Sequence, residues 1–198
     1  AELSFIGAVA ELDTAAAPFV VVDLGGGSTE VVVGSRHADT GYSADIGCVR
    51  ITERCLHSDP PTAGEIEAGR AMVRTRLGAA LRAVPVEGAR TWVGVAGTFT
   101  TLAALAQRMT TYDSEAIHLS TVGFAQLLPV CDELLAMTRR QRAALGPMHE
   151  GRVDVIGGGA IVVQELAREL GDRAGIAALT VSEHDILDGV ARSLVGAR

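Results

Sequence analysis

The segment from Asp23 to Glu30, which reads DLGGGSTE, holds the residues whose types and spacing suggest chemistry. Three consecutive glycines leave backbone N–H groups free to converge on an anion, and the two hydroxyls that follow add donors. The acidic residues at its two ends supply the oxygen ligands that Mg²⁺ prefers, directly or through water. The segment predicts a phosphate-binding loop with a magnesium ion. The predicted phosphate ligands are Gly25, Gly26, Gly27, Ser28 and Thr29, and the predicted metal ligands are Asp23 and Glu30.

This loop lies between two β runs, Phe19–Leu24 and Thr29–Val33. That position argues against the dinucleotide-binding fingerprint, which opens a helix, and the segment also lacks the lysine of a P-loop. The alternative is a plain hairpin with a glycine turn. A two-residue turn would suffice for a hairpin, and the polar cluster around the glycines would not be needed.

A second loop, Ala96-Gly97-Thr98, connects the short buried run Arg90–Val95 to a helix. The N–H groups at that helix start, with the Thr98 hydroxyl, could bind another phosphate or a nucleoside. A simple N-cap by Thr98 explains the same residues equally well. A third glycine cluster, Gly157–Gly159, continues into helical periodicity, which favours close helix packing or backbone approach to a ligand.

The remaining polar candidates are weaker. The five histidines are scattered, no pair has metal-ligand spacing on a helix, and each is interpreted as a surface or core residue. The three cysteines show no nucleophile or metal signature. Four arginines cluster between residues 139 and 152, and we interpret them as a solvated helix end, with a substrate track as the alternative. These are Arg139, Arg140, Arg142 and Arg152.

Composition restricts the class of protein. The 198 residues are 48% hydrophobic and 21% charged, as in an ordinary soluble globular protein. The net charge of −7 and a single tryptophan disfavour a nucleic-acid binder. No apolar run approaches the roughly 20 residues that span a bilayer, and no signal peptide is evident, so no membrane partner is expected. The odd number of cysteines favours a reducing, cytoplasmic location.

The pattern of elements indicates an α/β fold with a mixed central sheet flanked by helices. Thr62 and Glu65 form a capping box ahead of an amphipathic helix that runs to about Val84. Helices are also predicted after Thr98, over Leu127–Met137 and in the second half of Val153–Leu170. Further predicted elements are strands around Tyr42–Val49 and over Ala177–Val181, a helix over Glu183–Val195, and the body of a helix within Ala1–Ala10.

Five segments occur in an order that resembles the exopolyphosphatase / guanosine pentaphosphate phosphohydrolase family. They are VVDLGGGSTEVVVG, DIGCVRITE, GVAGTFTTLAAL, MHEGRVDVIGGGA and SEHDILDGVARSL. The first is shared in outline with the actin, sugar-kinase and heat-shock-chaperone superfamily. The last two are more specific and are similar to the actinobacterial branch.

The resemblance implies a ribonuclease-H-like (actin-like ATPase) fold and an enzyme that needs Mg²⁺. Family members release the terminal phosphate of inorganic polyphosphate, or the 5′-terminal phosphate of guanosine pentaphosphate, in a cleft between two domains. By position, Asp23 and Glu30 match acidic residues implicated in Mg²⁺ and phosphate handling. The resemblance also assigns donors to Gly25–Thr29 and places Gly97 and Thr98 at the same cleft.

The same resemblance implies that residues 1–198 are the second domain of a longer protein. Nothing in the chain matches the phosphate loop of the family's first domain. The family's general-base Glu lies in a Glu-Glu-Ala stretch whose Ala matches Ala1, so Glu2 does not inherit that role. We therefore expect no catalytic residue here, an inactive fragment, and possible homodimer formation through the exposed interdomain surface. A non-catalytic sensor of guanosine alarmones and a kinase relative of the superfamily are the alternatives.

Overall fold

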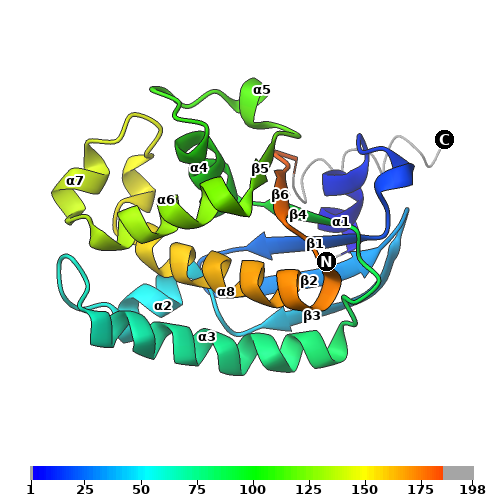
Figure 1. The fold of residues 1–198 in the computed structure, drawn as a ribbon, viewed down its shortest axis with the longest axis horizontal. Coiled ribbons are helices and arrows are strands. Elements are labelled where there is room, and N and C mark those ends of the chain that lie inside the picture. Colours follow the sequence, from blue (N-terminus) through cyan, green and yellow to red (C-terminus); the bar gives the residue numbers. More distant parts are fainter. Residues whose placement is uncertain (1, 185–198) are drawn as a thin grey trace.

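A six-stranded mixed β-sheet forms the centre of the molecule (Figure 1). The structure is a computed structural model that describes residues 2–184. The strand order is β3-β2-β1-β4-β6-β5; β1, β4 and β6 are parallel, and the other strands are antiparallel to their neighbours. This confirms the predicted α/β fold with a mixed sheet. The strands are β1 (Phe19–Leu24), β2 (Thr29–Gly34), β3 (Ala38–Ala44), β4 (Thr91–Val95), β5 (Thr121–Gly123) and β6 (Ala178–Val181).

Helices cover both faces of the sheet. The long helices α3 and α8 lie side by side across one face, and α1 packs on the other (Figure 1). Within residues 2–184, no helix has the length and apolar character needed to cross a bilayer. The α-helices are α1 (Glu2–Val9), α2 (Cys48–Cys55), α3 (Ala63–Ala83), α4 (Gly97–Ala106), α5 (Ser114–Ile117), α6 (Phe124–Ala136), α7 (Arg139–Ala143) and α8 (Ile156–Ala174), and the 3₁₀ turns are η1 (Thr14–Ala16) and η2 (Glu150–Arg152).

Strand β1 separates two hydrophobic clusters. Because successive side chains of a strand point to opposite faces, Val20 and Val22 join the large core under α3 and α8. Phe19 and Val21 instead pack in the smaller cluster that contains Phe5 of α1. Burial on both faces explains why β1 is a continuous apolar run rather than an alternating one.

The start of α3 is fixed by the predicted capping box. The Thr62 Oγ1 accepts a hydrogen bond from the Glu65 N–H at 3.3 Å, and the Glu65 carboxylate accepts one from the Thr62 N–H at 2.7 Å. These two bonds satisfy donors that a helix start leaves without intrahelical partners. The predicted helix is confirmed, with its end at Ala83.

The sequence predictions differ from the structure at several elements. The third strand covers Ala38–Ala44, and the predicted strand Tyr42–Val49 was wrong beyond residue 44: residues 45–47 precede α2, and its last two residues are the first two of α2. Helix α2 was not predicted. It buries Cys48, Ile51 and Cys55 on one face, but a helix of eight residues is too short to show helical periodicity clearly in the sequence. The three-residue strand β5 was not predicted. Residues 185–195 of the predicted last helix lie outside the described residues, and the two residues before them are not helical.

Candidate functional site

The start of α2 packs against the loop between β1 and β2 and forms hydrogen bonds with its carbonyl groups. The carbonyl of Gly25 accepts a hydrogen bond from the Cys48 N–H, and the carbonyl of Gly26 accepts from two further N–H groups of α2. The Arg50 Nε donates to the carbonyl of Gly27 at 2.9 Å. Among the described residues, no hydrogen bond joins the N–H groups of Gly26 and Gly27 to an acceptor in the chain. Fixing the carbonyls in this way leaves the amide side of the loop available to an anion.

Close approach of α2 to this loop requires a glycine at position 47. A Cβ on Gly47 would lie 2.4 Å from the carbonyl oxygen of Gly26, a distance that real Cβ atoms do not adopt. Gly47 is the N-cap residue of α2 and makes no side-chain cap. Its role is therefore to let the loop carbonyls take the place of a capping side chain.

The second predicted loop contains a strained residue. Ala96, the N-cap of α4, has φ 75° and ψ 169°, a region that residues other than glycine rarely adopt. No side chain caps α4, and its first N–H groups have no acceptor among the described residues. Thr98 lies inside the helix rather than at the cap, so the simple N-cap interpretation of Thr98 is wrong.

The third glycine cluster lets α8 begin beside both loops. A Cβ on Gly158 would lie 2.4 Å from the carbonyl oxygen of Cys48, and one on Gly159 would lie 2.7 Å from the Thr98 side chain. These contacts confirm the prediction of close packing by the glycines. Helix α8 also starts without a side-chain cap, and its N-cap residue is Val155.

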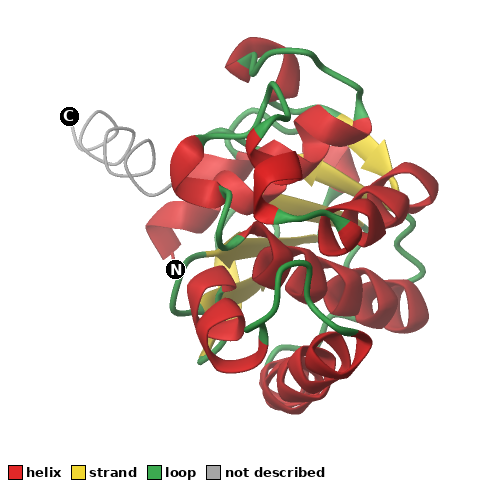
Figure 2. Cartoon of the chain, turned by 90° about the vertical axis from the view of Figure 1, so that its left-hand side faces the viewer, coloured by secondary structure: helices red, strands yellow, loops and turns green. Residues whose placement is uncertain are grey.

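Both loops and three helix starts surround one cavity of about 290 Å³. The cavity lies at the carboxyl ends of β1 and β4. Strand β1 points to the left in Figure 1, and Figure 2 views the molecule from that side. The uncapped N-termini of α4 and α8 carry partial positive charge, which attracts anions. The lining residues are Leu24, Gly25, Gly26, Cys48, Val49, Ala96, Gly97, Thr98, Gly151, Arg152, Val155 and Ile156.

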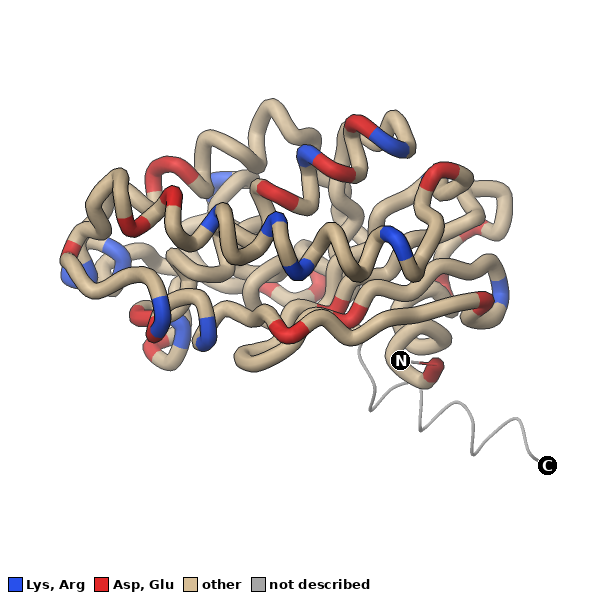
Figure 3. The backbone as a smooth tube through the Cα atoms, turned by 90° about the horizontal axis from the view of Figure 1, so that it is seen from below, with Lys and Arg blue, Asp and Glu red and all other residues tan. Residues whose placement is uncertain are grey.

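Arg152 is the charged residue among those that line the cavity. Its guanidinium lies over Gly97, where a Cβ would come within 2.4 Å of it, and its Nη1 donates to the Thr101 Oγ1 at 2.8 Å. A planar guanidinium fixed in this way suits an anion with several oxygens. In the view of Figure 3, acidic and basic residues are interspersed along the chain, so the net charge of −7 is not gathered in one region.

The four clustered arginines therefore differ in role. Arg139 pairs with Asp154 at 2.5 Å, which fits the predicted solvated helix end. The Arg142 side chain is only 7% exposed, and burial lowers its pKa. Arg152 belongs to the cavity, so the interpretation of all four as a solvated helix end was wrong.

Thr29, predicted as a phosphate ligand, is fully buried in the structure. Its hydroxyl donates to the carbonyl of Ile46 at 2.8 Å, so the hydroxyl proton is used to hold the loop. Gly27 and Ser28 lie in the same turn but do not line the cavity, whereas Gly25, Gly26, Gly97 and Thr98 do.

Asp23 and Glu30, the predicted metal ligands, face each other directly across β1 and β2. Side chains at opposite positions of an antiparallel pair have Cβ atoms about 5 Å apart, close enough for two carboxylates to share one hard cation. The Glu30 Oε1 also accepts a hydrogen bond from the Ser43 hydroxyl at 2.6 Å. The donor set fits Mg²⁺. These residues lie beside the cavity rather than in it, on the face of the sheet that carries α1.

The cavity contains one thiol, that of Cys48. Burial raises the pKa of this thiol, and the hydrogen bond with Thr98 only partly opposes the effect. The thiol therefore stays protonated at neutral pH and is no nucleophile. Sequence reasoning missed Cys48, Val49 and Arg152 as lining residues. The signals that could have found them are the glycine at position 47 and the basic residue five positions before the third glycine cluster.

Known proteins are similar to this chain in sequence and in structure. Residues 1–194 match the Ppx/GppA phosphatase family. The chain is 71% identical over 196 residues to a Mycobacterium tuberculosis protein named Exopolyphosphatase 2; this match covers 99% of the chain and 61% of that protein. The crystal structure of an exopolyphosphatase-like protein superposes with a TM-score of 0.94 at 38% identity, over 97% of the chain and 64% of that structure. The Aquifex aeolicus Ppx/GppA phosphatase superposes with a TM-score of 0.84 at 27% identity, over 96% of the chain and 61% of that structure.

Proposed function

This chain belongs to the Ppx/GppA phosphatase family, and we propose that its cavity binds the terminal phosphates of inorganic polyphosphate for release by hydrolysis. The observation that carries the proposal is the convergence of two uncapped helix starts, a glycine loop and Arg152 on one cavity. The chain spans only 61% of the Mycobacterium tuberculosis relatives it matches. The activity proposed is therefore that of the whole protein.

The residues of the cavity stabilise negative charge. In phosphoryl transfer, charge spreads over the equatorial oxygens of the transferred group, and catalysis consists largely of positioning and electrostatic stabilisation. Arg152 and the first N–H groups of α4 and α8 supply this stabilisation from fixed positions. Asp23 and Glu30 would hold Mg²⁺, which neutralises phosphate charge when it is bound.

The attacking water needs a general base that the cavity does not supply. No carboxylate or imidazole belongs to the described residues that line it. We infer that the 198-residue chain binds phosphate chains but does not hydrolyse them, the base being a glutamate of the full-length protein. A phosphate-release assay on this chain with tripolyphosphate and Mg²⁺ should stay at the background rate. Sustained Mg²⁺-dependent release would contradict this inference.

Binding itself is tested by calorimetry with tripolyphosphate. Arg152→Gln should weaken binding about tenfold or more, because a hydrogen bond to a charged group contributes about 1.5–3 kcal/mol. The matched control is Arg140→Gln, which removes the same charge from an exposed position. Equal losses in both variants, or no loss with Arg152→Gln, would refute the assignment of the cavity.

Guanosine pentaphosphate is the second candidate substrate, because the resemblance of the sequence segments implies it beside polyphosphate. The described lining residues include no aromatic side chain on which guanine could stack, which favours polyphosphate. If the cavity binds only the phosphate groups of its ligand, guanosine pentaphosphate and tripolyphosphate should bind with similar affinity. A clear preference for the nucleotide would favour the alarmone-sensing alternative.

The three cysteines are free and buried, which supports a reducing compartment such as the cytoplasm.

A further inference from the structure

Three residues from distant parts of the chain meet at a cluster outside the phosphate cavity. Glu11 follows α1, His118 follows α5, and His184 follows β6. One ligand atom of each lies within 4.8 Å of the others, and the two imidazole rings have centroids 4.2 Å apart. None of the three lines the phosphate cavity.

The spacing of this cluster matches metal coordination. The His118 Nε2 lies 3.5 Å from the Glu11 Oε2, and the His184 Nδ1 lies 3.2 Å from the Glu11 Oε1. Two ligands about 2.0–2.1 Å from a tetrahedral Zn²⁺ are themselves about 3.3 Å apart. Small side-chain movements would therefore bring one carboxylate oxygen and two nitrogens around a single ion.

The two nitrogens also lack ordinary partners. The His118 Nε2 and the His184 Nδ1 are shielded from solvent, and neither makes a hydrogen bond with a described residue. Both lie within ion-pair distance of Glu11, yet the approach does not have hydrogen-bond geometry. Buried polar atoms are normally satisfied, so two such atoms aimed at one carboxylate point to a missing ligand between them.

We propose that Glu11, His118 and His184 bind a divalent transition-metal ion of the Zn²⁺ type. Two imidazoles and one carboxylate are borderline ligands that suit Zn²⁺ or Co²⁺, whereas Mg²⁺ prefers oxygen ligands alone. The fourth position is open to water. The ion joins the end of α1 to the β5–β6 side of the sheet, and its role is to stabilise this junction.

The hydrogen bonding of His118 adds a chemical signature. Its Nδ1 accepts the N–H of Glu183 at 3.2 Å, so the neutral ring carries its proton on Nε2 when no metal is bound. Metal binding at Nε2 requires the other neutral tautomer, with the proton on Nδ1, so the hydrogen bond from the Glu183 N–H would be lost. The amide hydrogen of Glu183 should therefore exchange faster in the Zn²⁺-bound chain, a change that a simple ion pair between histidine and glutamate does not require.

The test uses the 198-residue chain and two metal probes, Co²⁺ for its visible absorption and Zn²⁺ for calorimetry. The wild type should bind one equivalent and develop Co²⁺ absorption bands of nitrogen and oxygen ligation. His118→Gln and His184→Gln should each weaken binding by at least about tenfold. The matched control, His57→Gln, removes an exposed histidine and should bind like the wild type.

Thermal unfolding with and without Zn²⁺ guards against variants that fail to fold. Zn²⁺ should raise the Tm of the wild type and of His57→Gln, and the increase should be lost in Glu11→Gln, a milder change that keeps both rings. Binding that is unaffected by all three cluster substitutions, or no Zn²⁺ binding by the wild type, would overturn the proposal.

Discussion

The start of α3 and the starts of α4 and α8 differ in how their first N–H groups are satisfied. At α3, Thr62 and Glu65 occupy those groups with a complete capping box. At α4 and α8, no side chain caps the helix, and the N-cap residues are Ala96 and Val155. The completed start has its donors satisfied within the chain, whereas the two incomplete starts leave donors available to a ligand.

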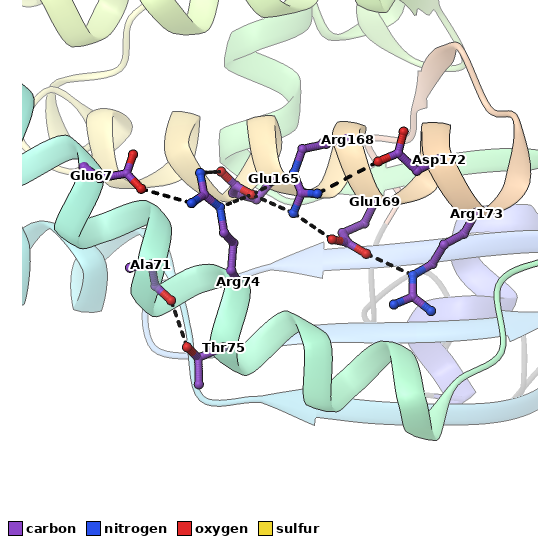
Figure 4. Close-up of polar contacts among 9 residues, drawn as sticks. All are labelled: Glu67, Ala71, Arg74, Thr75, Glu165, Arg168, Glu169, Asp172 and Arg173. Atoms are coloured by element: carbon purple, nitrogen blue, oxygen red, sulfur yellow. Dashed lines mark hydrogen bonds and ion pairs between the residues drawn. The ribbon is translucent and has the colours of Figure 1, made fainter.

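The same contrast extends along the helices. Away from the cavity, α3 and α8 are joined by a network of ion pairs around Glu165 (Figure 4). The Glu165 carboxylate is only 5% exposed and accepts hydrogen bonds from two nitrogens of Arg74 and from the Nε of Arg168. Satisfied polar groups thus stabilise the contact between α3 and α8, whereas the helix starts without a side-chain cap, those of α4 and α8, lie at the cavity. The predictions below test this division.

The largest effect should follow loss of the buried carboxylate. Glu165→Ala should lower the free energy of unfolding by about 2–4 kcal/mol, less than for a fully buried pair because both arginines are nearly half exposed and can be rehydrated. Glu67→Ala is the matched control, since Glu67 also pairs with Arg74 but is 57% exposed. Its cost should stay below about 1 kcal/mol in the same urea titration. Similar costs for both variants would show that burial of the carboxylate is unimportant.

Two glycines of α8 should differ in the effect of substitution, because Gly158 packs closely against α2 and Gly171 has only ordinary contacts. In Gly158→Ala the new Cβ would meet the carbonyl of Cys48, and the resulting displacement of α2 should cost about 1–3 kcal/mol and weaken tripolyphosphate binding. Gly171→Ala, in the same helix, meets only ordinary contacts and should stabilise the protein by up to about 1 kcal/mol. Chemical denaturation of the two variants gives the comparison. A stabilising Gly158→Ala would contradict the close packing described here.

Local sequence signals account for what could be predicted. The capping box of Thr62 and Glu65 and the glycine hairpin after β1 depend on residues a few positions apart, so they were readable. The roles of Thr29 and Arg152 depend on contacts that only folding creates. The Thr29 hydroxyl donates a hydrogen bond to the carbonyl of Ile46, and Gly97 leaves room for the Arg152 guanidinium. The histidine cluster was not predicted from the sequence for the same reason, because its members come from three separate segments.

The strained backbone at the second loop offers a smaller test. Ala96→Gly should stabilise the protein by about 0.5–1 kcal/mol, since relief of a strain of about 1–3 kcal/mol is partly offset by the greater flexibility of glycine in the unfolded chain. Ala71→Gly in the exposed part of α3 should instead destabilise it by about 1 kcal/mol. Differential scanning calorimetry should show the two Tm shifts in opposite directions. A lower Tm for Ala96→Gly would mean that this backbone conformation carries no strain.

The capped start of α3 should reveal itself through pH. Hydrogen bonds from the Thr62 backbone, and then from the His57 backbone, lower the pKa of Glu65 from 4.5 to about 2. A carboxylate with a lowered folded-state pKa stabilises the protein above the unfolded value, and this contribution disappears as the pH falls through the folded value. The stability difference between the wild type and Glu65→Gln should therefore be constant above about pH 5 and shrink between pH 4.5 and 2.

Urea titrations at a series of pH values measure this difference, and Glu67→Gln corrects for loss of one negative charge from the same helix. The Glu65→Gln gap should close on acidification after that correction. A gap that persists unchanged at pH 2 would show that the Glu65 carboxylate does not act through its charge. The start of α3 would then be satisfied by neutral hydrogen bonds alone, and its contrast with the open starts of α4 and α8 would concern geometry rather than electrostatics.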